Sequence, residues 1–333
     1  MSQKLVLIDG HSILNRAFYG VPDLSNAEGL HTNAIYGFLN IMFKILEEEK
    51  PDYLAVAFDV HAPTFRHQMY QAYKGTRKPM PEELRQQVPV MKEVLKAMHI
   101  TIMEQAGLEA DDILGTLARK SEAAGMDATI LSGDRDLLQL ATDRTKVIIT
   151  KKGISEFELY DHDAMVAKYG FTPEQFIDFK GLMGDQSDNI PGVPGVGEKT
   201  ATKLILEYGS VENLLASIDS MPKNKLREKI EDNQQLAVMS KRLATINTNA
   251  PVDFNIEEYT LTEPDYDRLI EIYTKLEFNS FLKKLKLPEK KTEINYSQRV
   301  VSSAEDIAAI KGEITLKVLS DGNHKDTPVI YGI

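Results

Sequence analysis

Cysteine is absent from the 333 residues, and so is any long apolar run. Without cysteine the chain can form no disulfide, use no thiol nucleophile and bind no cysteine-ligated zinc, so any metal must sit on oxygen or imidazole ligands. No apolar run approaches the ~18 residues that a membrane-spanning helix needs. The amino terminus also shows none of the regions of a secretory signal. We therefore expect a cytoplasmic protein with no membrane partner.

Positive charge is in short supply. The chain has 39 Lys and Arg residues against 50 Asp and Glu residues, which gives a net charge of −11. Such a balance is unfavourable for a polyanionic partner and most often means an acidic, solvated surface. Hydrophobic residues make up 42% and charged residues 27% of the chain, which excludes collagen-like and wholly disordered classes.

Short apolar runs lead into aspartates at three places in the first half of the chain. The runs cover residues 5–8, 54–58 and 129–131, and they precede Asp9, Asp59 and Asp134; residues 147–149 form a fourth candidate strand. Amphipathic helical patterns lie between them, so we expect an α/β fold with a mostly parallel, doubly wound sheet. In such sheets the functional crevice lies outside the carboxyl ends of the strands, which is where these aspartates fall.

Composition shifts predict four segments. We expect a catalytic α/β core over residues 1–180, a second subdomain over 181–287 that ends in one helix over 266–287, and a polar linker over 288–299. A fresh unit then begins over 300–333, with a helix at 303–311 and strands from 313 and 329. Because this last unit is cut short at residue 333, we expect the chain to be a fragment of a longer polypeptide.

Carboxylates gather where strands end and helices begin. A single one is best explained as a helix cap or turn residue. Together, however, they converge on one predicted sheet edge, and like charges so close repel one another unless a cation is bound. Magnesium or manganese is the expected partner, because hard ions prefer oxygen ligands. Setting this group aside leaves 41 acids against 39 bases, so the rest of the surface need not repel a polyanion. The nine residues are Asp9, Asp59, Glu109, Asp111, Asp112, Asp134, Asp136, Asp185 and Asp188.

The segment from Val60 to Pro81 contains no acidic residue. Its cations are Arg66, Lys74, Arg77 and Lys78, and its aromatic residues are Phe65, Tyr70 and Tyr73. Cations position phosphates and aromatic rings stack on bases, so the mixture suits single-stranded nucleic acid. A solvated basic loop would have a similar composition. The segment lies between a carboxylate-tipped strand and the next helix, which favours the functional interpretation.

A glycine-rich turn precedes a helical pattern near residue 198. Glycines let backbone amides approach a phosphate, and the helix that follows offers its positive amino end. The spacing is not that of an ATP-binding loop. A tight connection is the ordinary interpretation, but a hairpin of this form between two helices is used to bind duplex backbones non-specifically. The candidate contacts are Gly192, Gly195, Gly197, Lys199 and Thr200.

These motifs together resemble the 5′ nuclease (flap-endonuclease) family that includes the nuclease domain of bacterial DNA polymerase I. The resemblance covers roughly residues 1–287. The matching text is LIDGHS at 7–12, AFD at 57–59, YKGTR at 73–77, EADD at 109–112, SGDRD at 132–136 and GDQSDNIPGVPGVG at 184–197. Beyond residue 292 the text resembles the start of a proofreading-type domain without its Asp-x-Glu pair, so we expect that module to be inactive.

The resemblance implies a PIN-like nuclease core with a helical arch over about 60–88 and a helix-hairpin-helix subdomain. It implies that all nine carboxylates bind two or more magnesium or manganese ions, and that the hairpin holds a potassium ion. Lys74 and Arg77 would act on the scissile phosphate, while Arg66, Tyr73 and Lys78 would contact DNA. The expected substrates are DNA with a 5′ flap or an RNA primer, in replication and repair. We expect a monomer, with a polymerase domain in the same intact chain.

Two other functions fit parts of the pattern. A protein that binds branched DNA without cutting it would use the carboxylates only as caps and turns, but the complete set of nine argues against this. A related nuclease acting on RNA would not need the duplex-binding hairpin.

Overall fold

The computed structural model describes residues 2–151, 153, 155–285, 319–320 and 330–332. Residues Met1–Lys286 form one compact unit and Leu287–Ile333 a second. The second unit contributes a short antiparallel pair, β7 (Leu319–Ser320) and β8 (Ile330–Gly332). The expected linker and the helix at 303–311 lie outside the described residues. No described helix is both long enough and apolar enough to cross a membrane.

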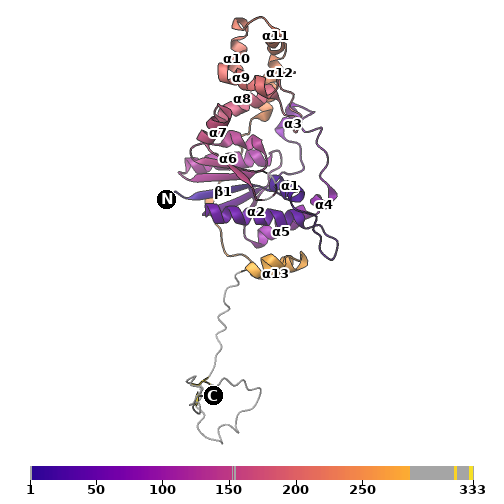
Figure 1. Ribbon diagram of the computed structural model, residues 1–333, viewed down its shortest axis with the longest axis vertical. Helices are drawn as coiled ribbons and strands as arrows, with labels where there is room; N and C mark the ends of the chain where they lie inside the picture. Colours follow the sequence, from indigo (N-terminus) through magenta and orange to yellow (C-terminus); the bar gives the residue numbers. More distant parts are fainter. Residues whose placement is uncertain (1, 152, 154, 286–318, 321–329, 333) are drawn as a thin grey trace, which may run out of the picture. The chain divides into compact units, whose positions relative to one another are not determined.

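A six-stranded sheet lies at the centre of the first unit (Figure 1), in the order β3-β2-β1-β4-β5-β6. All neighbours are parallel except β5 and β6, which confirms the mostly parallel α/β fold. Four strands match the expected runs, whereas three-residue β3 and antiparallel β6 were not predicted from the sequence. The strands are β1 (Lys4–Asp9), β2 (Tyr53–Ala57), β3 (Thr101–Met103), β4 (Asp127–Ser132), β5 (Thr145–Thr150) and β6 (Phe157–Tyr160).

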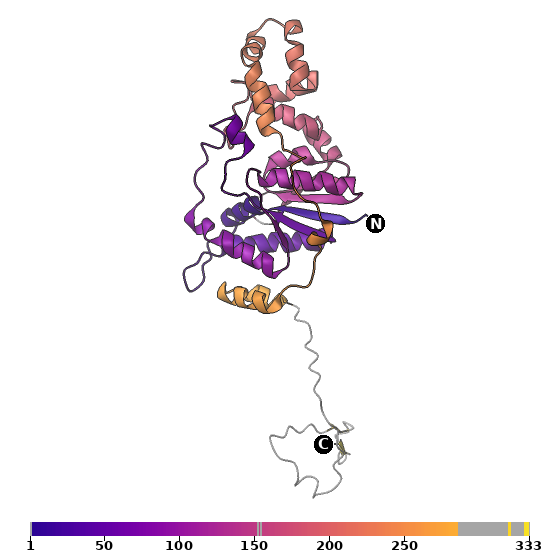
Figure 2. The same cartoon turned by 180° about the vertical axis from the view of Figure 1, so that it is seen from behind.

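Helices cover both faces of this sheet (Figures 1 and 2). Alternate side chains of a strand point to opposite faces. Accordingly Val6 and Ile8 of β1 pack into a core with the first group of helices, while Leu5 and Leu7 pack into a core with the second. The first group is α1 (Gly10–Gly20), α2 (Asn33–Glu49) and α5 (Gln87–Ala97), and the second includes α6 (Ala110–Ala123) and the 3₁₀ turn η1 (Arg135–Leu140).

A helical subdomain stands at one end of the sheet, at the top of Figure 1. Helix α8 packs against α9, α10 and α12, so these helices share one apolar interior. The helices are α7 (His162–Tyr169), α8 (Pro173–Met183), α9 (Glu198–Tyr208), α10 (Val211–Ala216), α11 (Lys225–Asp232) and α12 (Gln234–Ala244), with 3₁₀ turns η2 (Ile218–Ser220) and, farther along, η3 (Ile256–Tyr259).

The segment expected to form a helical arch contains little helix. Helix α3 (Phe65–Met69) and helix α4 (Glu82–Arg85) are short, and the chain between them consists of turns and extended backbone. Near α3, Tyr73 packs against Leu243 and Ala244 of α12. At the other end α4 contacts α1 and α5. The segment therefore runs as a strap from the helical subdomain to the helices α1 and α5 that cover one face of the sheet, as Figure 2 shows.

The single helix expected over residues 266–287 is two helices in the structure, α13 (Tyr266–Lys275) and α14 (Asn279–Lys284). Between them Glu277 has a φ of 60°, a left-handed conformation that no helix interior accommodates. The break lets Phe278 and Phe281 pack with Tyr273 and with Tyr36 of α2. An aromatic cluster thus fastens the end of this unit to its core.

Candidate active site

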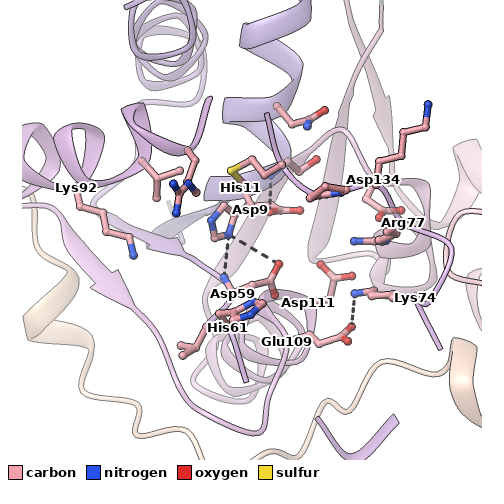
Figure 3. Close-up of a pocket in the computed structure, with 18 of the residues that line it drawn as sticks. Asp9, His11, Asp59, His61, Lys74, Arg77, Lys92, Glu109, Asp111 and Asp134 are labelled. Atoms are coloured by element: carbon pink, nitrogen blue, oxygen red, sulfur yellow. Dashed lines mark hydrogen bonds and ion pairs between the residues drawn. The ribbon is translucent and has the colours of Figure 1, made fainter. Parts of the chain in front are cut away.

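A cleft of about 1310 Å³ opens at the carboxyl ends of the strands (Figure 3). Five of the nine expected carboxylates line it, and so do three of the expected cations. The strand-end placement predicted from the sequence therefore brings acidic and basic side chains to one opening. These residues are Asp9, Asp59, Glu109, Asp111, Asp134, Lys74, Arg77 and Lys78.

Backbone and hydroxyl donors hold the strand-end carboxylates in place. Asp9, the last residue of β1, caps α1 by accepting from the Ser12 amide at 3.0 Å, and it also accepts from the Ser132 hydroxyl at 2.8 Å. Asp59, two residues beyond β2, accepts from the Ala110 amide at the start of α6 at 2.8 Å. Asp9 is thus bound to the start of α1 and Asp59 to the start of α6, as expected for carboxylates at helix amino ends.

Burial and mutual repulsion oppose the charged form of these carboxylates. Burial and the neighbouring Asp59 raise the pKa of Asp9 to about 7. Burial, with Asp9 and Asp134 nearby, also raises the pKa of Asp111 well above its usual range. A bound cation would offset both costs.

The donor set determines which cation would fit. Among the described residues, no three Asp, Glu or His side chains are gathered closely enough to form a ready-made metal site. The carboxylates of the cleft offer only oxygen ligands, and they carry unfavourable repulsion. Their chemistry fits a hard divalent ion such as magnesium or manganese.

Cations of the strap neutralise part of this acidic cleft. The Lys74 ammonium lies 3.0 Å from Glu109 Oε2 and 3.9 Å from Asp188 Oδ2, and the Arg77 guanidinium forms an ion pair with Asp188. Burial alone lowers the pKa of Lys74, but Glu109 and Asp188 outweigh it and raise that pKa above its ordinary value. Both basic residues are therefore charged and directed at the carboxylates (Figure 3).

Two family models match nearly all of the first unit. A 5′-3′ exonuclease N-terminal resolvase-like domain matches residues 4–170, and a 5′-3′ exonuclease C-terminal SAM fold matches residues 171–267. The chain belongs to the 5′-3′ exonuclease family. The boundary between the two models falls between α7 and α8 of this family member.

Curated relatives are DNA polymerase I proteins. The chain is 45% identical to DNA polymerase I of Bacillus caldotenax over 334 residues, and 46% identical to that of Bacillus subtilis over 337 residues. Each match covers 99% of this chain but 38% of the relative. This exonuclease-family chain thus spans little more than a third of the length of these relatives.

Solved structures share the fold at low sequence identity. Bacteriophage T5 5′-exonuclease with bound zinc superposes with a TM-score of 0.64 and 19% identity, over 83% of this chain and 99% of that one. The catalytic core of Rad2 with DNA substrate superposes with a TM-score of 0.56 and 18% identity, over 83% of this chain and 88% of that one. At such identities the likeness shows a shared fold for this 5′-3′ exonuclease chain.

Two further carboxylates of this exonuclease chain are joined by a lysine that the sequence analysis missed. The Lys180 ammonium on α8 lies 2.6 Å from Asp136 Oδ1 and also pairs with Asp185. Burial and the neighbouring Asp134 raise the pKa of Asp136 to about 7 despite this lysine. Lys180 is therefore a buried cation between the two carboxylates, and the only sign of it in the sequence was its place five residues before Asp185.

Asp112 and Arg66 differ from their expected roles. Asp112 has no solvent exposure, and it accepts two hydrogen bonds from the Arg66 guanidinium, at 2.8 and 2.9 Å. Arg66 is 2% exposed and also donates to the carbonyls of Leu243 and Thr245. In this arrangement Arg66 is not available to DNA, because it joins α3, α6 and the end of α12. The Asp112 carboxylate is likewise occupied by this arginine.

Tyr73 also differs from its expected role as a base-stacking residue. It is 3% exposed, and its hydroxyl lies 3.1 Å from Glu109 Oε2 and 3.0 Å from Asp188 Oδ2. Burial and these two carboxylates raise the pKa of Tyr73 far above its usual range, so it acts as a neutral donor. Because so little of the ring is exposed, it offers no face on which a base could stack.

The glycine hairpin divides into a buried and an exposed part. Gly192 is buried, and a Cβ at this position would lie 2.4 Å from the Gly184 amide nitrogen, so the packing alone already requires glycine here. Gly195, Gly197 and Lys199 are exposed at the start of α9. Thr200 is half-buried, and its amide donates to the Gly197 carbonyl at 3.0 Å.

Proposed function

We propose that this chain is the 5′ nuclease part of a DNA polymerase I-type protein. It hydrolyses phosphodiester bonds where duplex DNA meets a 5′ single strand, and it removes 5′ flaps and RNA primers in replication and repair. The observation that carries this proposal is the cleft in which carboxylates from three strand ends face Lys74 and Arg77. Membership of the 5′-3′ exonuclease family supports it.

We assign divalent metal binding to the carboxylates of the cleft, to Asp136 and Asp185 beside Lys180, and to Asp188. Asp9, Asp59, Glu109, Asp111 and Asp134 would hold magnesium or manganese from the cleft side. Asp136 would contribute from η1, and Asp185 and Asp188 from the chain that follows α8. Asp112 would support the site from the first turn of α6. When bound, such ions supply an activated water and stabilise the leaving oxygen.

Lys74 and Arg77 act on the phosphate group that is cleaved. They pair with Glu109 and Asp188, which keeps both side chains beside the carboxylates. If magnesium or manganese neutralises the carboxylates, Lys74 and Arg77 are free to bind phosphate oxygens. Placed there in advance, they stabilise the charge that develops in the transition state.

The duplex lies against the exposed half of the glycine hairpin. Gly195 and Gly197 let the backbone approach a phosphate, and Lys199 adds a cation at the amino end of α9. Exposed Lys78 contacts the single strand beside the cleft. A potassium ion on hairpin carbonyls, a monomeric state, a cytoplasmic location and a polymerase domain in the intact chain remain predictions.

A cleavage assay tests this function. A DNA substrate with a labelled 5′ flap, and a matched substrate whose 5′ strand is RNA, are incubated with the protein with and without magnesium. We expect release of the labelled 5′ segment near the junction only with magnesium. Binding of the flap substrate without cleavage in magnesium or manganese would instead support the non-cleaving, branched-DNA-binding alternative.

A further inference from the structure

His11 lies in the cleft beside the proposed metal ligands but is not one of them. Its ring is about one fifth exposed and lines the cleft beside Asp59. The ring packs edge-on against Phe58, with centroids 5.2 Å apart and an interplanar angle of 87°. Gly10 makes room for this contact, since a Cβ there would lie 2.5 Å from the Phe58 ring. The imidazole is thus held in one orientation.

The Nδ1 atom of His11 accepts a hydrogen bond from the backbone amide of Asp59 at 3.1 Å. The preceding amide, Phe58, donates to Met103 at the end of β3. The next amide faces α1 instead, where β1 has already ended at Asp9, so no strand carbonyl is available to it. The imidazole replaces the missing carbonyl, and Figure 3 shows this contact. A backbone donor that would otherwise lose its partner is satisfied in this way.

This contact also determines the protonation of the ring. Because Nδ1 accepts from an amide, it carries no proton, and the neutral ring carries its proton on Nε2. Neither nitrogen then offers a free lone pair to a metal ion. His11 is therefore not a further ligand, although it touches a residue that we propose as one.

We infer that His11 is a positioning residue that fixes Asp59 for metal binding through its Nδ1 atom. Asp59 is held at two points. Its backbone amide donates to His11 Nδ1, and its carboxylate accepts from the Ala110 amide. The first holds the backbone of Asp59 and the second holds the direction of its side chain. Losing such a supporting contact typically weakens metal binding about 10-fold or more. The inference rests on the proposed role of Asp59 as a ligand.

Three substitutions of His11 separate this role from others. In His11→Asn the amide oxygen takes the place of Nδ1, whereas in His11→Gln the amide group takes the place of Nε2. His11→Ala removes both. We expect Mn²⁺ affinity, measured without DNA by electron paramagnetic resonance, to fall about 10-fold in His11→Ala and His11→Gln. His11→Asn should stay within about twofold of the unsubstituted protein, on the same supporting-contact argument.

A second measurement needs neither metal nor activity. Hydrogen exchange of the Asp59 amide in the metal-free protein, followed by NMR, should be faster in His11→Ala and His11→Gln and unchanged in His11→Asn. His162→Ala, on the partly exposed face of α7 and outside the cleft, is the matched histidine control and should alter neither readout.

The outcomes distinguish this inference from the proposed function. Unchanged Mn²⁺ affinity and unchanged Asp59 exchange in His11→Ala would overturn the inference, and so would recovery by His11→Gln but not by His11→Asn. If Asp59→Ala also binds Mn²⁺ normally, the proposed ligand set is wrong. If only Asp59→Ala fails to bind, the ligand set stands and the role of His11 is wrong.

Discussion

Arg66 and Asp112 form a doubly hydrogen-bonded ion pair in which neither side chain is more than 3% exposed. The Asn247 amide also donates to Asp112, at 2.9 Å, while Arg66 reaches the carbonyls of Leu243 and Thr245. The pair therefore connects the strap, helix α6, which Glu109 caps and which carries Asp111, and the chain leaving the helical subdomain. This ion pair therefore holds three segments of the nuclease together.

Removing either side chain of this ion pair should lower the free energy of unfolding. Removing one partner of a buried ion pair leaves an uncompensated buried charge, which costs about 3–5 kcal/mol. We expect Arg66→Ala and Asp112→Ala each to lower the free energy of unfolding by about that amount, measured by urea denaturation. The double substitution should cost less than the sum of the two, because it leaves no buried charge behind. Additive effects would show that the two side chains do not depend on each other.

Loss of a proposed ligand should affect turnover more than DNA binding. We expect Asp134→Ala and Asp185→Ala to reduce single-turnover cleavage of a 5′ flap by about 100-fold or more, because stabilisation of the transition state is lost. Flap affinity, measured by fluorescence anisotropy in calcium, should change little, since phosphate contacts lie elsewhere. Asp163→Ala, at a fully exposed side chain on α7, is the matched control. Full cleavage in excess EDTA would contradict metal dependence itself.

Strand ends could be predicted because the signal is local. An apolar run followed by aspartate fixes both the strand and the edge at which its carboxylate lies, and Asp9, Asp59 and Asp134 all line the cleft. Pairings between distant residues leave no such pattern. Arg66 lies 46 positions from Asp112 and 177 from Leu243. The sequence therefore shows no sign of these contacts, and Arg66 was predicted to bind DNA although the fold buries it.

Short strands and helix breaks also could not be predicted from the sequence pattern. Three-residue β3 is too short to show periodicity, and it forms because β2 offers it an edge. The break at Glu277 interrupts a continuous helical pattern, because packing of Phe278 and Phe281 outweighs the helix propensity of a few residues. Lys180 likewise lies in an ordinary amphipathic helix, and only the fold places it between Asp136 and Asp185.

Lys199 should contribute one phosphate contact with duplex DNA. Each contact adds about 0.9 to the magnitude of the slope of log affinity against log salt concentration. We expect Lys199→Ala to bind a duplex-containing substrate more weakly, with a slope smaller by about that amount. Lys146→Ala, an exposed lysine on β5, should leave the slope unchanged. If Lys199→Ala also leaves it unchanged, the glycine hairpin is only a structural connection.

Asp9 should destabilise the metal-free protein at neutral and higher pH. Its folded-state pKa, raised to about 7 by burial and by Asp59, exceeds the unfolded value of 3.8. Between these two pH values the folded state binds more protons than the unfolded state. The contribution of Asp9 to the stability of the fold therefore falls as pH rises through that range. In EDTA we expect Asp9→Asn to melt at a higher temperature than the unsubstituted protein at pH 8, with the difference shrinking towards pH 5. A lower melting temperature at pH 8 would show that Asp9 stabilises the fold as a charged cap.

Lys74 links the strap to the cleft, and its removal tests the whole arrangement. Its ammonium lies 3.0 Å from Glu109 Oε2, and we expect it to reach a phosphate only when the junction lies beneath the strap. We expect Lys74→Ala to slow single-turnover cleavage by about 100-fold, the scale of one lost charge-stabilising donor, while equilibrium binding changes little. Lys96→Ala, an exposed lysine on α5, is the control. A bulky block on the free 5′ end, added before the enzyme, should also slow cutting of a long flap. If the blocked flap is cut as fast as the open one and Lys74→Ala retains full activity, the strap is an ordinary surface loop and takes no part in cleavage.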